Sequence, residues 1–267
     1  MASSGLKLRF LMVVLFIITF NSVAATTSNP CDDASLRDIT DRGSISNTPC
    51  VLPAKEGMLE IGYQYKRFAY DGGLQNFPQS VLFFGLPANS ELAIVVPNYN
   101  QQSNRPFTGF SATTVGVKNE IAYGKGWVVG AEIFLTPSGG SSAFGNQGYG
   151  VTANAMASYT ISSDIFMTLM VGGSTATESR FDDGGRFNSF NPSLALMYAP
   201  TEKMSFFAEV FAQTKTGPYL GSNYNVDCGV LYSLNKNVVL DLEVGQQLTH
   251  LADSFNQFIG AGVSLRL

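Results

Sequence analysis

Charged side chains are scarce in this sequence, and so are long apolar runs. Aspartate, glutamate, lysine and arginine make up 13% of the 267 residues, against about 25% in an average soluble domain. An ordinary soluble surface needs more charge than this, so a soluble globule is not expected. After Phe20 the chain also lacks any apolar run of about 18 residues, which excludes a bundle of transmembrane helices.

The mean hydropathy is nevertheless positive, at +0.10. The apolar residues must therefore be spread along the chain instead of gathered in a few segments. A membrane β-barrel has this property, because only every second residue of each strand faces lipid. The scarcity of charge and the absence of long apolar runs together favour such a barrel.

Residues that carry catalysis or bind metals are also few. The one histidine, His250, has Asp253 and Ser254 nearby in a polar segment, which leaves a lipid-modifying enzyme open as an alternative. No histidine–cysteine cluster suggests a metal, and residues 182–185 (DDGG) indicate a turn more than a calcium loop. With a net charge of −4, nucleic acid is not an expected partner. We predict no enzyme activity, catalytic residues, metal or cofactor.

The N-terminus has the pattern of a secretory signal. Lys7 and Arg9 precede an apolar core at residues 10–20, and small residues follow at 21–25. This core is too short to span a bilayer, which needs about 20 residues. We predict a signal peptide over residues 1–24, with a short membrane anchor as the alternative.

Residues 25–57 lack any regular alternation and contain two of the three cysteines. Cys31 and Cys50 flank a polar segment, and an exported protein meets oxidising conditions, so we predict a Cys31–Cys50 disulfide; two independent thiols are the alternative. We expect a periplasmic N-terminal extension that lies under or inside the barrel. Cys228, on the apolar side of a strand pattern, is expected to be buried or lipid-facing.

Alternation with a period of two residues marks the rest of the chain. In residues 224–234 apolar and polar side chains alternate, and Leu231 alone breaks the pattern. Side chains of a strand point to opposite faces in turn, so this stretch has one lipid-facing and one lumen-facing side. Comparable stretches predict twelve strands, at 59–66, 81–86, 91–99, 115–121, 127–136, 151–161, 165–172, 193–198, 205–213, 224–234, 238–245 and 259–267.

The connections between these strands alternate between short and long. Short turns are expected at 87–90, 123–126, 162–164, 200–203 and 235–236, and long polar loops at 69–79, 100–109, 138–148, 174–188, 215–222 and 248–254. Bacterial barrels have short periplasmic turns and long external loops. We therefore predict an all-β fold, a closed antiparallel transmembrane barrel over residues 58–267. A soluble β-sandwich is the main alternative, but it gives no reason for the alternating connections.

The lumen-facing positions carry charged and amide side chains of both signs. They are open to two interpretations: a hydrated pore lining that tunes selectivity, or a narrow, closed barrel in which the charges pair. The candidate pore-lining residues are Glu60, Gln64, Lys66, Lys118, Glu120, Glu132, Asn154, Glu209, Asp241, Glu243 and Arg266.

Several motifs resemble the family of outer-membrane transporters named for the "MetA-pathway of phenol degradation". They are FPQSVLFFGLPANSELAIVVPNY (77–99), FSATTVGVKNEIAYGKGWVVGAEIFLTPSG (110–139), GYGVTANAMASYTIS (148–162) and FIGAGVSLRL (258–267). The chain departs from the family at Phe83 and Phe84, where an arginine often precedes the Gly-Leu pair. It also ends in Leu267, where barrel chains usually end in an aromatic residue.

The resemblance implies a channel or transporter for small solutes, aromatic or hydrophobic ones among them, in the bacterial outer membrane. Its expected partners are outer-membrane lipid, the solute, and the barrel-assembly machinery during biogenesis. A surface barrel that binds a partner without transport is the first alternative, and the lipid-modifying enzyme around His250 is the second.

Overall fold

The computed structural model describes residues 28–68, 72–103, 107–179, 184–249 and 255–267. The predicted signal peptide, the His250–Asp253–Ser254 group and Asp182 lie outside these ranges. Within them the fold is built almost wholly of strands, with one short helix, α2 (Leu36–Ile39). No helix in the described part of the chain is long and apolar enough to cross a membrane.

The strands follow one another along the chain as antiparallel neighbours. Their bounds are β1 (Gly57–Phe68), β2 (Gly73–Leu86), β3 (Ser90–Val96), β4 (Tyr99–Gln102), β5 (Thr108–Phe110), β6 (Thr114–Gly124), β7 (Trp127–Thr136), β8 (Gly150–Thr160), β9 (Ile165–Thr177), β10 (Arg186–Tyr198), β11 (Met204–Gln213), β12 (Asn223–Asn235), β13 (Val238–Gln247) and β14 (Phe255–Arg266).

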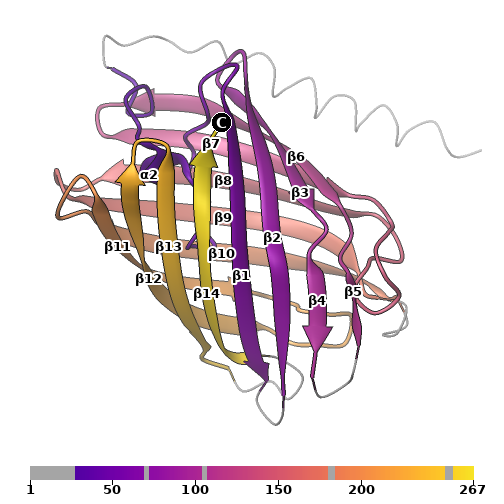
Figure 1. Ribbon diagram of the computed structural model, residues 1–267. Helices are drawn as coiled ribbons and strands as arrows, with labels where there is room; N and C mark the ends of the chain where they lie inside the picture. The colour runs from indigo at the N-terminus through magenta and orange to yellow at the C-terminus, as the bar shows by residue number, and fades with distance from the viewer. Residues whose placement is uncertain (1–27, 69–71, 104–106, 180–183, 250–254) are drawn as a thin grey trace, which may run out of the picture.

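The sheet closes on itself, because β1 pairs with β14 on one side and with β2 on the other (Figure 1). Two of the wall strands are interrupted. β2 pairs with β3 through residues 80–86 and with β4 through residues 74–77, so β3 and β4 form one wall strand. β5 and β6 form the next one in the same way. The wall therefore has twelve strands, which confirms the predicted closed barrel and its strand number.

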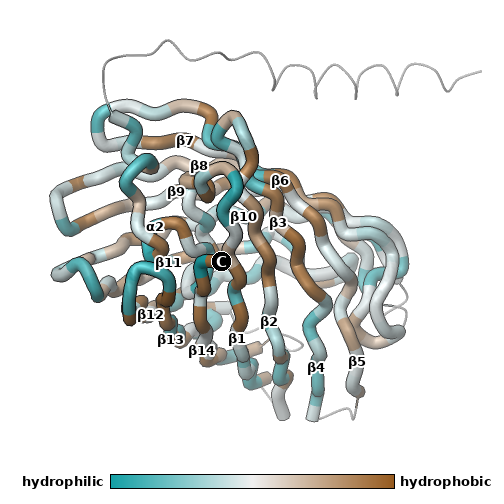
Figure 2. The backbone as a smooth tube through the Cα atoms, turned by 45° about the horizontal axis from the view of Figure 1, so that its top comes forward, coloured by the Kyte–Doolittle hydropathy of each residue, from teal (hydrophilic) through white to brown (hydrophobic). Residues whose placement is uncertain are grey.

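The predicted alternation is present in the wall. On β13, Leu242 is 46% exposed on the outside, whereas its neighbours Asp241 and Glu243 are 6% and 7% exposed and face inward. Apolar and polar residues alternate along the strands in Figure 2. The membrane favours this pattern. The backbone groups of the wall are hydrogen-bonded between strands, and only the outward side chains contact hydrocarbon.

Several connections predicted as long loops are shorter than expected. Of the predicted loops, residues 73–79, 100–102 and 108–109 belong to β2, β4 and β5, while β9 continues to Thr177 and β10 begins at Arg186. The prediction was wrong at these ends because it required apolar residues at alternate positions. Beyond the lipid layer polar residues can occupy both faces of a strand, so the pairing continues without that pattern.

Residues 28–56, which we call the plug, lie inside the wall at the end that carries the short turns (Figure 1). This position explains why Leu231 and Phe207 break the alternation, since both are buried inward beside Gly43 of the plug. The apolar contact between plug and wall is formed by Leu36, Ile39, Cys50 and Leu52 of the plug with Met58, Phe83, Ala93, Val128, Leu231 and Val239 of the wall.

A charge placed on the outer face should weaken the barrel. Leu242 lies at the middle of β13, so we expect Leu242→Arg to lower the free energy of unfolding by about 2–4 kcal/mol, the usual cost of an arginine near the bilayer midplane. Urea titration of the protein in liposomes measures this change. Asn237→Arg, in the turn between β12 and β13, is the control and should leave stability unchanged; equal stability of both variants contradicts the assignment of the outer face.

Candidate functional site

The plug is held by carboxylates that project inward from the wall. Glu209 on β11 accepts hydrogen bonds from the backbone N–H groups of Ile45 (2.6 Å) and Ser46 (2.8 Å), and from the Ser46 hydroxyl. Glu60 on β1 accepts bonds from the Thr40 hydroxyl (2.6 Å) and the Asp41 N–H (3.0 Å). An irregular chain inside a barrel lacks a sheet partner for its N–H groups, so these charge-assisted bonds satisfy them.

Three further wall carboxylates bind the plug elsewhere. Glu91 accepts the N–H of Leu52 at 2.9 Å. Glu120 accepts the side-chain amide of Asn29 at 2.6 Å, and Glu132 accepts that of Asn47 at 2.7 Å. These bonds come from β3, β6 and β7, so the plug is fixed to several strands of the wall.

Two buried ion pairs add to these hydrogen bonds. Arg42 makes a bidentate contact with Asp241, with Nε–Oδ2 at 2.7 Å and Nη2–Oδ1 at 3.0 Å. Its guanidinium lies against Gly62 and Gly262, where a Cβ atom would overlap it. These glycines therefore make room for the arginine between β1 and β14.

The second ion pair joins the plug to β6 and β3. Lys118 contacts Asp41 of the plug at 2.9 Å and Glu91 of the wall at 3.3 Å. All three side chains are buried, and a buried pair that loses one member leaves an uncompensated charge. The plug and the wall therefore depend on each other for charge balance.

The predicted disulfide between Cys31 and Cys50 is confirmed, with Cα atoms 5.4 Å apart. It closes most of the plug into a covalent loop, and loops of this length gain about 3 kcal/mol of stability in the chain-entropy account. Cys228 is a free thiol exposed on the outer face.

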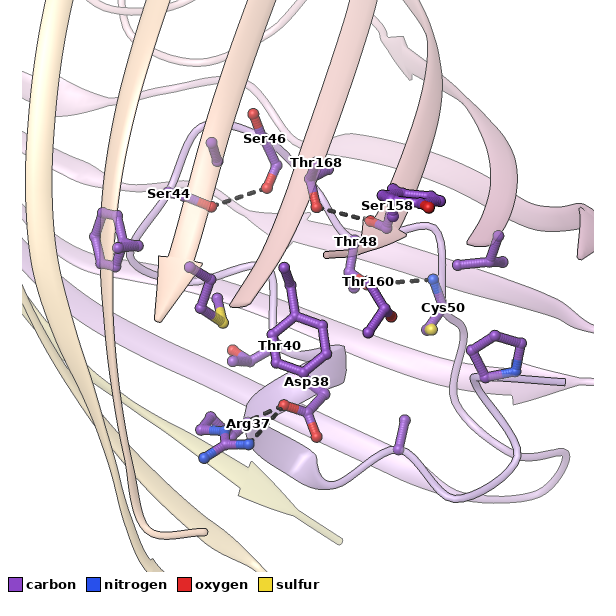
Figure 3. A pocket seen from close by; sticks show the side chains of 18 of the residues that line it. Arg37, Asp38, Thr40, Ser44, Ser46, Thr48, Cys50, Ser158, Thr160 and Thr168 are labelled. Atoms are coloured by element: carbon purple, nitrogen blue, oxygen red, sulfur yellow. Dashed lines mark hydrogen bonds and ion pairs between the residues drawn. The ribbon is translucent and has the colours of Figure 1, made fainter. Parts of the chain in front are cut away.

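The plug leaves a gap on one side of the lumen. A cavity of about 260 Å³ lies between it and the short-turn ends of β7 to β12. Figure 3 shows hydroxyl side chains from both sides of this cavity. From the plug they are Thr40, Ser44, Ser46 and Thr48, and from the wall Ser158, Thr160 and Thr168; Ala195, Met197 and Phe207 supply the apolar part of the lining.

The wall beside this gap carries no ionisable side chain on its inner face. Alternation places these inward residues on β8, β9 and β10: Thr152, Asn154, Met156, Ser158 and Thr160; Phe166, Thr168, Met170, Gly172 and Ser174; Ser189, Asn191, Ser193, Ala195 and Met197. We call this surface the neutral arc. The hydroxyls of Ser158 and Thr168 form a hydrogen bond to each other at 2.7 Å, so these two polar groups have a partner within the wall.

Most of the candidate pore-lining residues lie against the plug. Glu60, Lys118, Glu120, Glu132, Glu209 and Asp241 all contact it, and Asn154 donates to Glu132 at 2.6 Å. Arg266 also contacts the plug, with its Nε atom 3.4 Å from Glu56. Three candidates make other contacts instead: Gln64 donates to Glu243 at 3.0 Å, and Lys66 lies over the Phe255 ring at 5.1 Å.

The predicted pore-lining set omits two inward carboxylates, Glu91 and Asp227. It also omits every residue of the neutral arc except Asn154, although alternation predicts that several of them, such as Ser158 and Thr168, lie on the polar side of their strands. Asp227 was placed on the polar side of its strand but not among the lining residues. Alternation alone would have included both acids, whereas the serines and threonines of the arc give no distinct sequence signal. Among the described residues, no group of three histidine, cysteine, aspartate or glutamate side chains could hold a metal ion.

A closed antiparallel barrel with an apolar exterior, a polar interior and short turns at one end defines an outer-membrane β-barrel protein. The NanC porin has this fold, with a TM-score of 0.57 and 13% identity over 78% of this chain and 100% of that one. The KdgM porin, in a structure with disordered oligogalacturonate, has a TM-score of 0.54 and 12% identity over 77% of this chain and 98% of that one. No curated protein matches the sequence.

The family model described as "Putative MetA-pathway of phenol degradation" matches residues 40–267. The chain therefore belongs to this family, as its motifs indicated. The match begins at Thr40, so it includes most of the plug together with the wall.

Removing the plug's arginine should loosen the plug. Arg42→Met leaves Asp241 buried without its partner, and we expect a loss of about 3–5 kcal/mol, as for other broken buried pairs. Hydrogen exchange of the amides at residues 40–46 should become faster while the wall strands stay protected. Lys55→Met, at an exposed plug position, is the matched control; unchanged exchange in Arg42→Met contradicts the anchoring role.

Proposed function

We propose that this protein is a passive outer-membrane channel in which small uncharged solutes pass between the plug and the neutral arc. The observation that carries this proposal is the cavity of about 260 Å³ on that side of the plug. Elsewhere the plug is bonded to the wall through Glu60, Glu91, Glu120, Glu132 and Asp241. The arc contacts the plug through the Ser193 and Ser46 hydroxyls, 2.7 Å apart, and the cavity lies beside that contact.

The chemistry of the arc supports uncharged, partly apolar solutes. Hydroxyls such as those of Ser158 and Thr168 can bond a polar group, while Met197 and Phe207 offer apolar contact. A charged solute would gain no ion pair from the arc and would lose hydration in the narrow gap. On the plug side of the cavity, Arg37 and Asp38 already pair with each other at 3.1 Å. The family description names phenol, a small solute that is uncharged at neutral pH and has both a hydroxyl and an apolar ring.

The proposal includes the remaining features of the chain. Residues 1–24 direct export as a signal peptide, residues 25–57 form the N-terminal extension that restricts the lumen, and the barrel-assembly machinery inserts residues 58–267. The protein catalyses no reaction, since the inward carboxylates that bind the plug have a structural role.

A bulky side chain on the arc should slow transport. We expect Thr168→Trp, which fills the gap, to reduce several-fold the rate of liposome swelling with a small neutral solute that the lipid bilayer alone excludes. Leu169→Trp is the matched control, because Leu169 is the next residue of β9 and is 46% exposed on the lipid side. Swelling that is absent in the unmodified protein, or equal in the two variants, contradicts the proposed passage.

A further inference from the structure

The outer face of the wall is hollowed where β11 to β14 and β1 follow one another. This groove has a volume of about 640 Å³, and small outward side chains form its floor. Ala208 of β11 lies across from Cys228 of β12, and Cys228 lies across from Val244 of β13. Ile259 of β14 and Tyr65 of β1 continue the same row. A hollow of this composition on the lipid side of the barrel accepts hydrocarbon in preference to water.

Three polar side chains border the groove at one end, and we call them the polar row. Arg67 of β1 lies across from Gln257 of β14, and Gln257 lies across from Gln246 of β13. All three are exposed on the outward face and line the groove. The three therefore form one lateral row across neighbouring strands, next to the apolar floor.

The polar row has no partner within the part of the chain that the structure describes. Arg67 makes no ion pair or hydrogen bond there, and the side-chain amides of Gln246 and Gln257 make no hydrogen bond. A charged side chain on the lipid face costs free energy, and the cost falls toward the membrane interface. An anionic group supplied by the membrane itself would balance the arginine, so the row is complementary to a negatively charged headgroup.

The polar row lies at the edge of the lipid layer, at the end of the barrel away from the short turns. Leu59 begins the outward apolar residues of β1, and Arg67 lies about 26 Å further along the strand at 3.3 Å per residue. With the usual strand tilt of about 40°, this is about 20 Å along the membrane normal, close to the apolar band of about 25 Å. Since the short turns are periplasmic, the row faces the headgroups of the outer leaflet.

The width of the polar row favours a large headgroup. Arg67 and Gln246 are separated by two strand spacings, which is about 10 Å. A single phosphodiester is too small to reach both ends of the row, whereas a phosphorylated disaccharide can contact all three side chains. The charge, the width and the leaflet together indicate lipid A, the phosphorylated part of lipopolysaccharide.

We propose that the groove and the polar row bind one lipopolysaccharide molecule through its lipid A part. The Arg67 guanidinium pairs with a lipid A phosphate, because its planar fork can donate two parallel hydrogen bonds. The amides of Gln246 and Gln257 donate to oxygen atoms of the sugars. One acyl chain lies in the groove over Ala208 and Cys228. The site is on the lipid side of the wall, so it goes beyond the proposed passage of solutes through the lumen.

Native mass spectrometry of the full-length protein, titrated in detergent with one lipid at a time, tests the headgroup contact. We expect tighter binding of lipid A than of phosphatidylglycerol or phosphatidylcholine. Arg67→Gln should lower the apparent affinity for lipid A about tenfold, because it removes charge-assisted hydrogen bonds. Arg186→Gln is the matched control and should change nothing, since this exposed arginine already donates to the Thr175 hydroxyl and the Tyr149 carbonyl.

Substitutions at Cys228 test the groove separately from the headgroup. Cys228→Phe fills the floor and should weaken lipid A binding, whereas Cys228→Ala keeps the floor open and should bind lipid A as the unmodified protein does. Both variants keep an apolar side chain on the lipid face, so the barrel should stay folded. Urea titration in liposomes checks this and separates a lost lipid site from a lost fold.

Three results would overturn the inference. They are equal binding of lipid A and phosphatidylcholine by the unmodified protein, unchanged lipid A binding in Arg67→Gln, and tighter binding of phosphatidylglycerol than of lipid A. The last result would assign the groove to a phospholipid instead. Because the groove lies outside the lumen, each of these results leaves the proposed channel in place.

Discussion

The inner organisation of this protein depends on one constraint: an irregular chain inside a barrel needs partners for its backbone N–H groups. The wall strands supply few of them, as the Gly85 carbonyl of β2 does for Lys55 at 3.0 Å, since most of their backbone groups are bonded to one another. Side-chain carboxylates do so instead, as Glu209 does for Ile45 and Ser46 and Glu91 does for Leu52. The acidic inner face and the irregular plug are therefore two parts of one arrangement.

The same constraint shapes the open side of the lumen. Where the plug binds, the wall carries charges and close-packing glycines, among them Gly62, Gly85 and Gly130, which let plug atoms approach the strand backbone. On β8 to β10, where the plug bonds through Ser46 to Ser193, the rest of the inner face has hydroxyls, amides and thioethers.

Much of the wall could be predicted from the sequence, because lipid imposes a period of two on every strand that crosses it. The two exceptions to that alternation also have a structural reason. Leu231 and Phe207 are apolar on the inner face because Gly43 of the plug lies against them. The outer ends of β2 and β4 could not be predicted in the same way, since polar residues such as Asn76 and Asn100 face a region without lipid.

The contacts of the plug were beyond sequence reasoning, although its disulfide and its place under or inside the barrel were expected. Two cysteines in an exported polar segment have few alternatives to pairing, whereas the contacts of Thr40, Arg42 and Ser46 follow no period and join residues far apart in the chain. Those contacts decide which wall carboxylates bind the plug. Alternation therefore identified most of the lumen-facing set but could not distinguish anchoring residues from those that act on a solute.

An engineered cross-link between plug and wall tests this account most directly. The hydroxyls of Ser46 in the plug and Ser193 on β10 lie 2.7 Å apart, so Ser46→Cys combined with Ser193→Cys should form a disulfide in the folded protein without added cross-linker. Mass spectrometry of digested peptides should then find these two positions joined, beside the native Cys31–Cys50 pair. Two free thiols that a water-soluble maleimide modifies completely would contradict a plug seated inside the barrel.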